Sequence, residues 1–173
     1  MLKKAIILLT AIMLMTAGCG GKTAINDNLT RDGFIAGYNR QAESENAEVL
    51  KPTESTGDTM KLSVGINEQM LLTGDERVTK IEAATFRTSY DASREMVRQM
   101  IWRSLKTVGF AEADIDDIKT QLSAKEEENK AQEAVQDVTG IRDTTINFTQ
   151  GDKKYKMVEH VKDDKFSIAV SAK

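Results

Sequence analysis

The spacing of hydrophobic residues along this chain alternates between a helical and an extended rhythm, and each change marks an expected element. Apolar residues at every fourth position predict a helix over residues 30–47 whose buried face consists of Phe34, Tyr38 and Ala42. A loop is expected over residues 51–59, where the only proline stands among Ser, Thr and Gly.

Three strands are expected after this loop. Apolar and polar residues alternate over 60–66, which is the period of a half-buried strand and places Ile66 inside it. Residues 70–73 can return the chain, and residues 78–87 carry a third extended pattern. Antiparallel pairing through short turns is the simplest arrangement for three such strands.

Two helices are expected next. The first covers residues 91–108 and ends at Gly109; its core stripe is Val97, Ile101, Leu105 and Val108. The second begins near the acidic run at 114–117 and buries Ile115, Ile118 and Leu122. Residues 124–138 favour a helix by propensity but offer little to bury, so they form an exposed helical extension or a mobile arm.

The chain ends in three more extended segments, 144–149, 153–159 and 165–172, with turns at 150–152 and 162–164. The expected fold class is therefore α+β, an antiparallel sheet packed against helices in the order α-βββ-αα-βββ. The order is that of a duplicated helix–sheet unit, with halves 29–88 and 89–173. Direct alignment of the halves leaves their apolar residues one position out of register, so the repeat lies in the elements and not in the residues.

The first residues have a different pattern. A cationic start at Lys3 and Lys4 precedes an apolar run and a small-residue exit before Cys19, the only cysteine. This is the order of parts in a secretory signal peptide. The Thr-Ala-Gly-Cys end resembles the lipobox of bacterial lipoproteins. Over residues 29–173 the element order is similar to the tandem helix–sheet arrangement of β-lactamase-inhibitor-like proteins and small envelope lipoproteins.

The lipoprotein resemblance implies that Cys19 carries a diacylglyceryl group and that residues 1–18 are cleaved. Residues 19–28 then form a lipidated terminus and flexible tether for a single α+β domain, 29–173. Two or more acyl chains, such as palmitate, give durable membrane attachment. Gly20 lacks the aspartate of inner-membrane retention, which implies the outer membrane in a two-membrane host and the outer face of the plasma membrane otherwise.

Three alternatives stay open for the leader. A transmembrane helix needs roughly 17–25 apolar residues, and this run is shorter. An ordinary cleaved signal peptide would leave Cys19 unused. A buried core helix is the third alternative, which the leading lysines disfavour.

The net charge of the chain limits the classes of partner that we expect. The chain has a formal net charge of −3, and cleavage before Cys19 leaves 22 basic residues against 27 acidic ones. A mildly acidic, mixed-sign surface argues against nucleic acid and gives no polybasic route to anionic lipid. The expected partners are the membrane, through the lipid, and a protein of the envelope.

The sequence offers little convergent chemistry. The single histidine, His160, stands beside Glu159 in an extended segment, so the two side chains point to opposite faces and cannot act as a dyad. No second histidine or free thiol is available for a nucleophilic pair or a zinc site. Asp114, Asp116 and Asp117 lack the ligand spacing of a calcium loop and are expected to favour a helix start. We therefore expect no catalytic residues, no metal and no cofactor.

One surface feature is a candidate binding site. Arg94, Arg98 and Trp102 follow each other at four-residue spacing, and Trp102 lies away from the apolar stripe of its helix. Tryptophan and arginine are enriched at interface hot spots. The alternative is that Trp102 packs under the first or third helix, with arginine stacked on its ring.

The sequence thus predicts a membrane-anchored, exported lipoprotein with a small non-enzymatic binding or envelope-accessory domain. An immunity or inhibitor lipoprotein that blocks a toxin or hydrolase by presenting its sheet is the alternative. A carboxylate-dependent hydrolase would require two facing carboxylates in one cleft.

Overall fold

The computed structural model describes residues 23–86, 91–136, 141–162 and 165–173. They contain three helices, namely α1 (Arg31–Ser44), α2 (Asp91–Thr107) and α3 (Glu112–Gln136). The strands are β1 (Lys51–Thr56), β2 (Thr59–Val64), β3 (Glu68–Thr73), β4 (Lys80–Thr85), β5 (Ile141–Gln150), β6 (Lys153–Lys162) and β7 (Lys165–Ala172).

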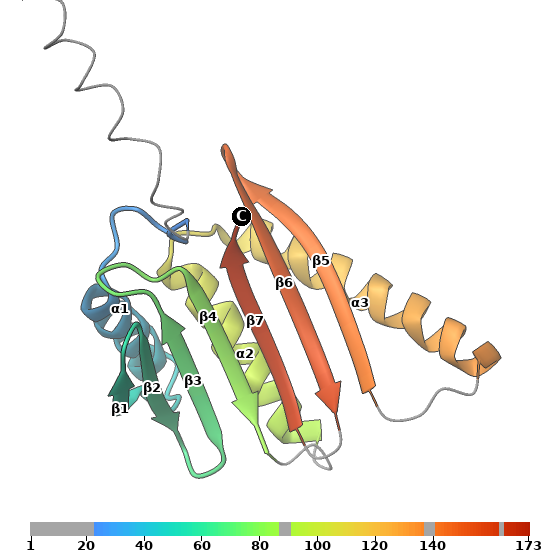
Figure 1. Ribbon diagram of the computed structural model, residues 1–173, viewed down its shortest axis with the longest axis horizontal. Helices are drawn as coiled ribbons and strands as arrows, with labels where there is room; N and C mark the ends of the chain where they lie inside the picture. The colour runs from blue at the N-terminus through green and yellow to red at the C-terminus, as the bar shows by residue number, and fades with distance from the viewer. Residues whose placement is uncertain (1–22, 87–90, 137–140, 163–164) are drawn as a thin grey trace, which may run out of the picture.

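The strands form one seven-stranded antiparallel sheet in the order β1-β2-β3-β4-β7-β6-β5. Pairing of β4 with β7, in which Ala83 lies opposite Ile168, joins the earlier strands to the later ones. The helices lie behind the sheet in the view of Figure 1, all on the same face. The predicted α+β class, an antiparallel sheet packed against helices, is confirmed.

The core lies between the helices and the inner face of the sheet. Helix α2 is central, and its predicted stripe of Val97, Ile101, Leu105 and Val108 is buried. The predicted faces of α1 and of the first half of α3 are buried too. Gly109, with φ +101°, follows α2 in the left-handed conformation that favours glycine.

Strand β1 corrects the prediction of a loop over 51–59. All six of its residues are exposed, so it carries no alternation of burial that a sequence pattern could reveal. It is held by backbone pairing with β2, and its register shifts between Pro52 and Glu54. An edge strand tolerates proline because one side of its backbone needs no partner strand.

Ile66 is also placed differently from the prediction. The chain turns after Val64, with Gly65 at φ +71°, so Ile66 lies in the β2–β3 connection and not in the strand. Its side chain is 95 % exposed. The alternation of apolar and polar residues continues past the end of the strand to Ile66, because Gly65 allows the chain to reverse its direction there.

Residues 24–28, which the sequence places in a flexible tether, lie against the domain. Ile25 is buried, and its backbone N–H donates to the carbonyl of Val78 at 2.8 Å. The Tyr155 hydroxyl donates to the Ile25 carbonyl at 3.0 Å, and Lys153 forms an ion pair with Asp27 at 2.6 Å. The chain therefore leaves the domain at the end of the sheet that also carries the C-terminus (Figure 1).

Within the part of the chain that the structure describes, no helix is both long enough and apolar enough to cross a bilayer.

Candidate functional site

The helices leave one face of the seven-stranded sheet uncovered (Figure 1). Strand alternation assigns residues to it. On β6, Tyr155, Met157 and Glu159 are buried on the helix side, so Lys156 and Val158 between them face outward. We call the outward-facing residues of β2 to β7 the open face.

Positive charge gathers on the open face. Its lysines come from four strands: Lys61, Lys80, Lys154, Lys156, Lys162 and Lys165. The open face carries two acidic residues among these lysines. Glu82 pairs with Lys80 at 2.8 Å, and Asp143 pairs with His160. The open face is therefore basic although the whole chain has a net charge of −3.

A shallow hollow of about 400 Å³ lies at the centre of the open face. The register sets its composition: Glu82, Ala169 and Val158 lie side by side in one row, and Ala84, Ser167 and His160 form the next. Small side chains form the floor, while Lys80, Lys156 and Lys165 stand around it. A low-lying centre that includes Ala169 and Val158, with a charged rim, is compatible with a protein-binding patch.

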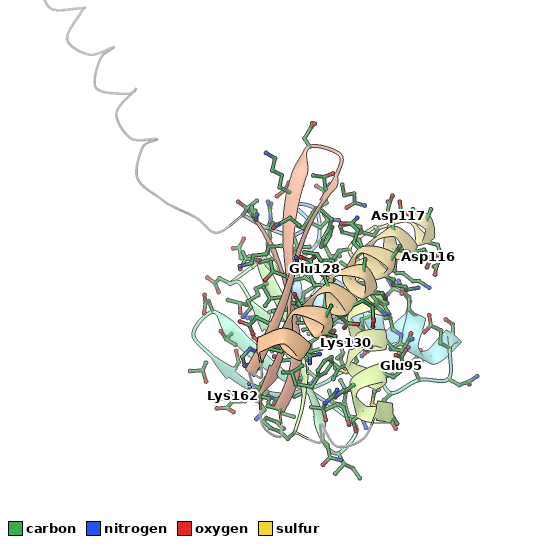
Figure 2. The ribbon with its side chains drawn as sticks, turned by 90° about the vertical axis from the view of Figure 1, so that its right-hand side faces the viewer. Glu95, Asp116, Asp117, Glu128, Lys130 and Lys162 are labelled. Atoms are coloured by element: carbon green, nitrogen blue, oxygen red, sulfur yellow. The ribbon has the colours of Figure 1, made fainter. Side chains whose placement is uncertain are left out.

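Negative charge gathers on the opposite side of the molecule. Helix α3 contains eight acidic residues and three lysines. Figure 2 shows Asp116, Asp117 and Glu128 along this helix. The protein thus has a basic sheet side and an acidic helix side. The net charge of the whole chain does not reveal this separation, because opposite charges cancel in the sum.

A partly buried ion cluster lies between the helices and the inner sheet face. Arg98 Nη2 donates to Glu126 Oε1 of α3 at 2.5 Å and to Glu159 Oε2 of β6 at 3.1 Å. Beside it, Asn129 of α3 donates to the Thr144 hydroxyl at 3.0 Å, and Thr144 is the cross-strand neighbour of Glu159. These polar contacts attach the second half of α3 to the sheet.

Burial sets the charge state of this cluster. The pKa of Glu159 is raised to about 7, first by loss of solvation and then by the neighbouring Glu126 carboxyl, against the opposing effect of Arg98. The pKa of Arg98 is also raised: burial lowers it, but the charges of Glu159 and Glu126 outweigh that effect. Arg98 therefore stays charged while Glu159 exchanges its proton near neutral pH.

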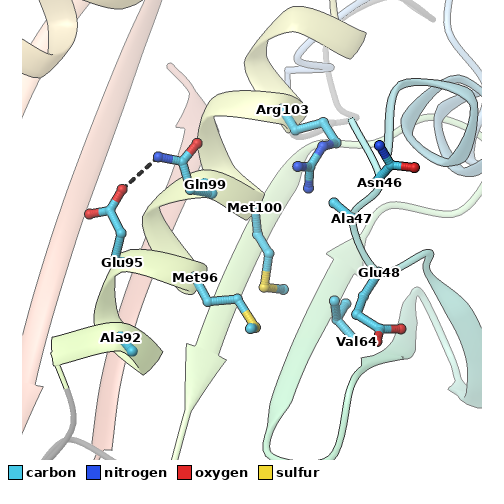
Figure 3. A pocket seen from close by; sticks show the side chains of 10 residues that line it. All are labelled: Asn46, Ala47, Glu48, Val64, Ala92, Glu95, Met96, Gln99, Met100 and Arg103. Carbon is cyan, nitrogen blue, oxygen red and sulfur yellow. Dashed lines mark hydrogen bonds between the residues drawn. The ribbon is translucent and has the colours of Figure 1, made fainter. Parts of the chain in front are cut away.

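A second hollow, of about 380 Å³, separates α2 from the segment that follows α1 (Figure 3). Met96 and Met100 enter it from α2, and Ala47 and Val64 border it on the other side. Arg103, at one end, is held by Glu45 at 2.7 Å and by the Tyr38 hydroxyl at 3.0 Å. The hollow is mainly apolar and suits an aliphatic side chain.

The sequence-predicted site residues fall in three places. Cys19 lies outside the described residues. Trp102 is buried at 6 % exposure, which contradicts its role in an exposed patch and agrees with the packed alternative. Arg94 and Arg98 do not border an exposed tryptophan; their guanidinium carbons lie 5.8 and 5.7 Å from the centre of the Phe166 ring.

His160 and Glu159 point to opposite faces, as expected from strand geometry: Glu159 is buried and His160 reaches Asp143 on the open face. Among the described residues, no group of three or more His, Cys, Asp or Glu side chains is placed to hold a metal ion.

Sequence reasoning missed the open face and the Glu126–Arg98–Glu159 cluster. A signal for the first existed, because Lys154, Lys156 and Lys162 share one parity in β6, opposite Tyr155 and Met157. The cluster joins residues 61 positions apart, and no local spacing announces it.

Comparison with protein-family models, curated proteins and solved structures gives no match to this chain.

Proposed function

We propose that this chain is a lipid-anchored, non-enzymatic binding protein of the bacterial cell envelope that docks an acidic protein surface on its open face. The observation that carries the docking role is the excess of lysine over acid on an uncovered sheet in a protein of net negative charge. Complementary charge steers association and selects partners.

The composition of the open face supports a protein partner over a nucleic acid. On the described strands, its outward positions carry no phenylalanine, tyrosine, tryptophan or arginine; the rings near it are the imidazole of His160 and the ring of Phe86 beside Lys165. Single-stranded nucleic acids are bound by stacking on aromatic rings, and base readout relies on arginine. Small residues such as Ala169 and Ser167 instead allow close approach of another folded surface.

The leader supports the anchoring part of the proposal. Lipidation at Cys19 would hold the membrane only a few residues from Ala24, since residues 24–28 lie on the domain. The short connection would keep the end of the sheet near the C-terminus close to the bilayer and leave the open face accessible from the side. The envelope compartment follows from the leader: the outer membrane in a two-membrane host.

A catalytic role is less well supported. Glu126 and Glu159 do meet in one cleft, which is the arrangement that a carboxylate-dependent hydrolase requires. However, Arg98 occupies the space between them as an ion-pair partner, and Glu159 is only 4 % exposed. We therefore propose that the pair holds α3 on the sheet.

The alternative, an immunity or inhibitor lipoprotein, uses the same surface with an enzyme as partner. The observation in its favour is the β2–β3 connection, where Ile66 projects at 95 % exposure beside the sheet. A protruding aliphatic side chain can enter a partner's cleft. Inhibition assays against co-encoded hydrolases distinguish this version from an accessory protein.

Docking is tested by affinity capture from crosslinked envelopes of cells that express the full chain. Replacing Lys80 and Lys156 with glutamate should reduce partner capture about tenfold or more, because two rim charges are reversed. The matched control reverses Lys119 and Lys125 on α3, and it should capture the partner like wild type. Equal capture by both double variants would exclude the open face.

Anchoring is tested by growth on radiolabelled palmitate. Wild type should be labelled and sediment with membranes, whereas Cys19→Ala should be unlabelled. A wild-type chain that is unlabelled and remains unprocessed would contradict the lipoprotein assignment, independently of the docking result.

A further inference from the structure

A cleft of about 310 Å³ on the helix side concentrates basic side chains from separate elements. Its lining includes Arg94 and Arg98 of α2, Lys130 of α3 and Arg142 of β5. Figure 2 shows Lys130 and Glu95 on the two helices that border it. The acids of the cleft are Glu95, Glu126 and Glu159, so the basic groups outnumber them.

The carboxylates of the cleft do not pair equally with these cations. Glu126 and Glu159 both bond to Arg98. Arg94 lies against the Phe166 ring at 5.8 Å, and its buried Nε has no hydrogen-bond partner in the part of the chain that the structure describes. This Nε–H is itself covered by protein atoms, but the side chain as a whole is only half-buried and lines the cleft, so a ligand there would meet the outer guanidinium nitrogens.

We propose that this cleft binds an oxyanion group, of the carboxylate, phosphate or sulfate type, on the guanidinium of Arg94. Guanidinium groups bind oxyanions with two parallel hydrogen bonds, and the Phe166 ring fixes the plane of this one. Lys130, which also pairs with Glu127 at 2.7 Å, and Arg142 stand on the other walls of the cleft. This site lies on the other side of the sheet from the open face and does not depend on the docking proposal.

Proton uptake by Glu159 couples to this binding. Arg98 and Glu126 interact with Glu159 directly. The other charged groups that line the cleft with it are Arg94 and Glu95 from α2, Lys130 from α3 and Arg142 from β5. The neighbour of Glu159 on β7 is the apolar Ile168. Since burial raises the pKa of Glu159 to about 7, acidification through neutral pH removes one negative charge from the cleft and strengthens anion binding.

Sulfate is the suitable probe because its charge does not change between pH 6 and pH 8. The measurement is a sulfate titration of the full chain in detergent, at constant ionic strength, followed through the arginine Nε–H signals in ¹H–¹⁵N NMR spectra. We expect the Arg94 Nε–H signal to shift with saturation, and sulfate to bind several-fold more tightly at pH 6 than at pH 8.

Two variants and one control make the result decisive. Arg94→Gln should abolish saturable binding, and Glu159→Gln should keep binding but lose its dependence on pH. Arg40→Gln, at an exposed position of α1, should bind like wild type. Acetate and methyl phosphate, titrated in the same way, then distinguish a carboxylate ligand from a phosphate ligand.

The proposal is overturned if the Arg94 signal does not move, or if Arg94→Gln retains wild-type sulfate binding. Arg94→Lys keeps the charge without the paired donors, and it guards against a folding defect in the glutamine variant. Its sulfate binding should be weaker than wild type, and unchanged binding would count against recognition by the guanidinium.

Discussion

At the scale of single residues, burial rather than charge type decides what the polar side chains do. Glu159 and Arg98 lie on the inner side of the sheet, where Arg98 pairs with both Glu159 and Glu126 while the two carboxyls oppose each other's ionisation. Removing one member of a buried ion cluster leaves an uncompensated charge, so such groups are sensitive to mutation and to pH.

Glu159 should make the stability of the protein depend on pH. Its pKa rises from 4.5 to about 7 on folding, so between these values the folded chain holds the proton that the unfolded chain releases. The contribution of Glu159 to the free energy of unfolding therefore falls as pH rises through this window, by at most about 3 kcal/mol. Urea unfolding at pH 5, 6, 7 and 8 should show wild type losing stability relative to Glu159→Gln.

The control for that experiment is Glu43→Gln, at an exposed position of α1. Its stability should follow the wild-type curve across the same pH range. A difference between wild type and Glu159→Gln that stays constant from pH 5 to 8 would contradict the assignment.

Trp102 should act as a core residue. Since it is 6 % exposed, Trp102→Ala should lower the free energy of unfolding by about 3–5 kcal/mol. The exposed Ile66→Ala should change it by about 0.5 kcal/mol or less. Chemical denaturation measures both, and a Trp102→Ala protein as stable as wild type would restore the interpretation of Trp102 as a surface hot spot.

The sequence predicted the direction of Trp102 around its helix correctly, but it did not predict which elements cover the side chain. Helical periodicity places it away from the stripe of Ile101 and Leu105, and that geometry holds. However, α1 and α3 both contact α2, so positions outside the sheet-facing stripe are also covered. A helical pattern shows which way a side chain points around the axis of its own helix. Whether a segment distant in the sequence covers that side chain can be learned only from the fold.

At the scale of elements, hydrophobic periodicity fails as a guide where an element is held by main-chain or polar contacts. Strand β1 is held by main-chain pairing and by one hydrogen bond from the Thr53 hydroxyl to the Lys61 carbonyl. The second half of α3 is held by Asn129 and Glu126 rather than by apolar residues. Both lack the hydrophobic spacing that predicts elements. The strands and helices that bury one face, such as β2 and α2, were predictable for the same reason.

Gly74, in the β3–β4 connection, is the turn residue with the least tolerance. Its φ is +126°, and a Cβ there would lie 1.9 Å from the carbonyl oxygen of Arg77. Gly74→Ala should therefore cost at least about 3 kcal/mol of stability. The comparison is Gly57→Ala: φ is +58° with nothing within 4 Å of the added carbon, so the cost should be about 1–2 kcal/mol.

Thermal unfolding of the two glycine variants tests this ranking. Gly74→Ala should unfold at a much lower temperature than Gly57→Ala. Equal midpoints would show that the β3–β4 connection can rearrange without loss, contrary to the close approach that we describe.

At the scale of the whole molecule, the sheet separates charge. Lysines at alternate positions of β6 point away from the helices, while α3 carries the acids on the other side. Net charge alone suggested no basic surface, because opposite faces cancel in a sum. The order of elements was accessible from the sequence; the basic face required the parity of each strand and its register with the next.

The most direct test of the central claim is photo-crosslinking in living cells from two positions of the full chain. One photoreactive residue replaces Val158, on the floor of the open face, and the other replaces the exposed Asp117 of α3. We predict a discrete crosslinked protein from position 158, lost when Lys80 and Lys156 are changed to glutamate, and none from position 117. Crosslinks from position 117 but not from position 158 would contradict docking on the open face.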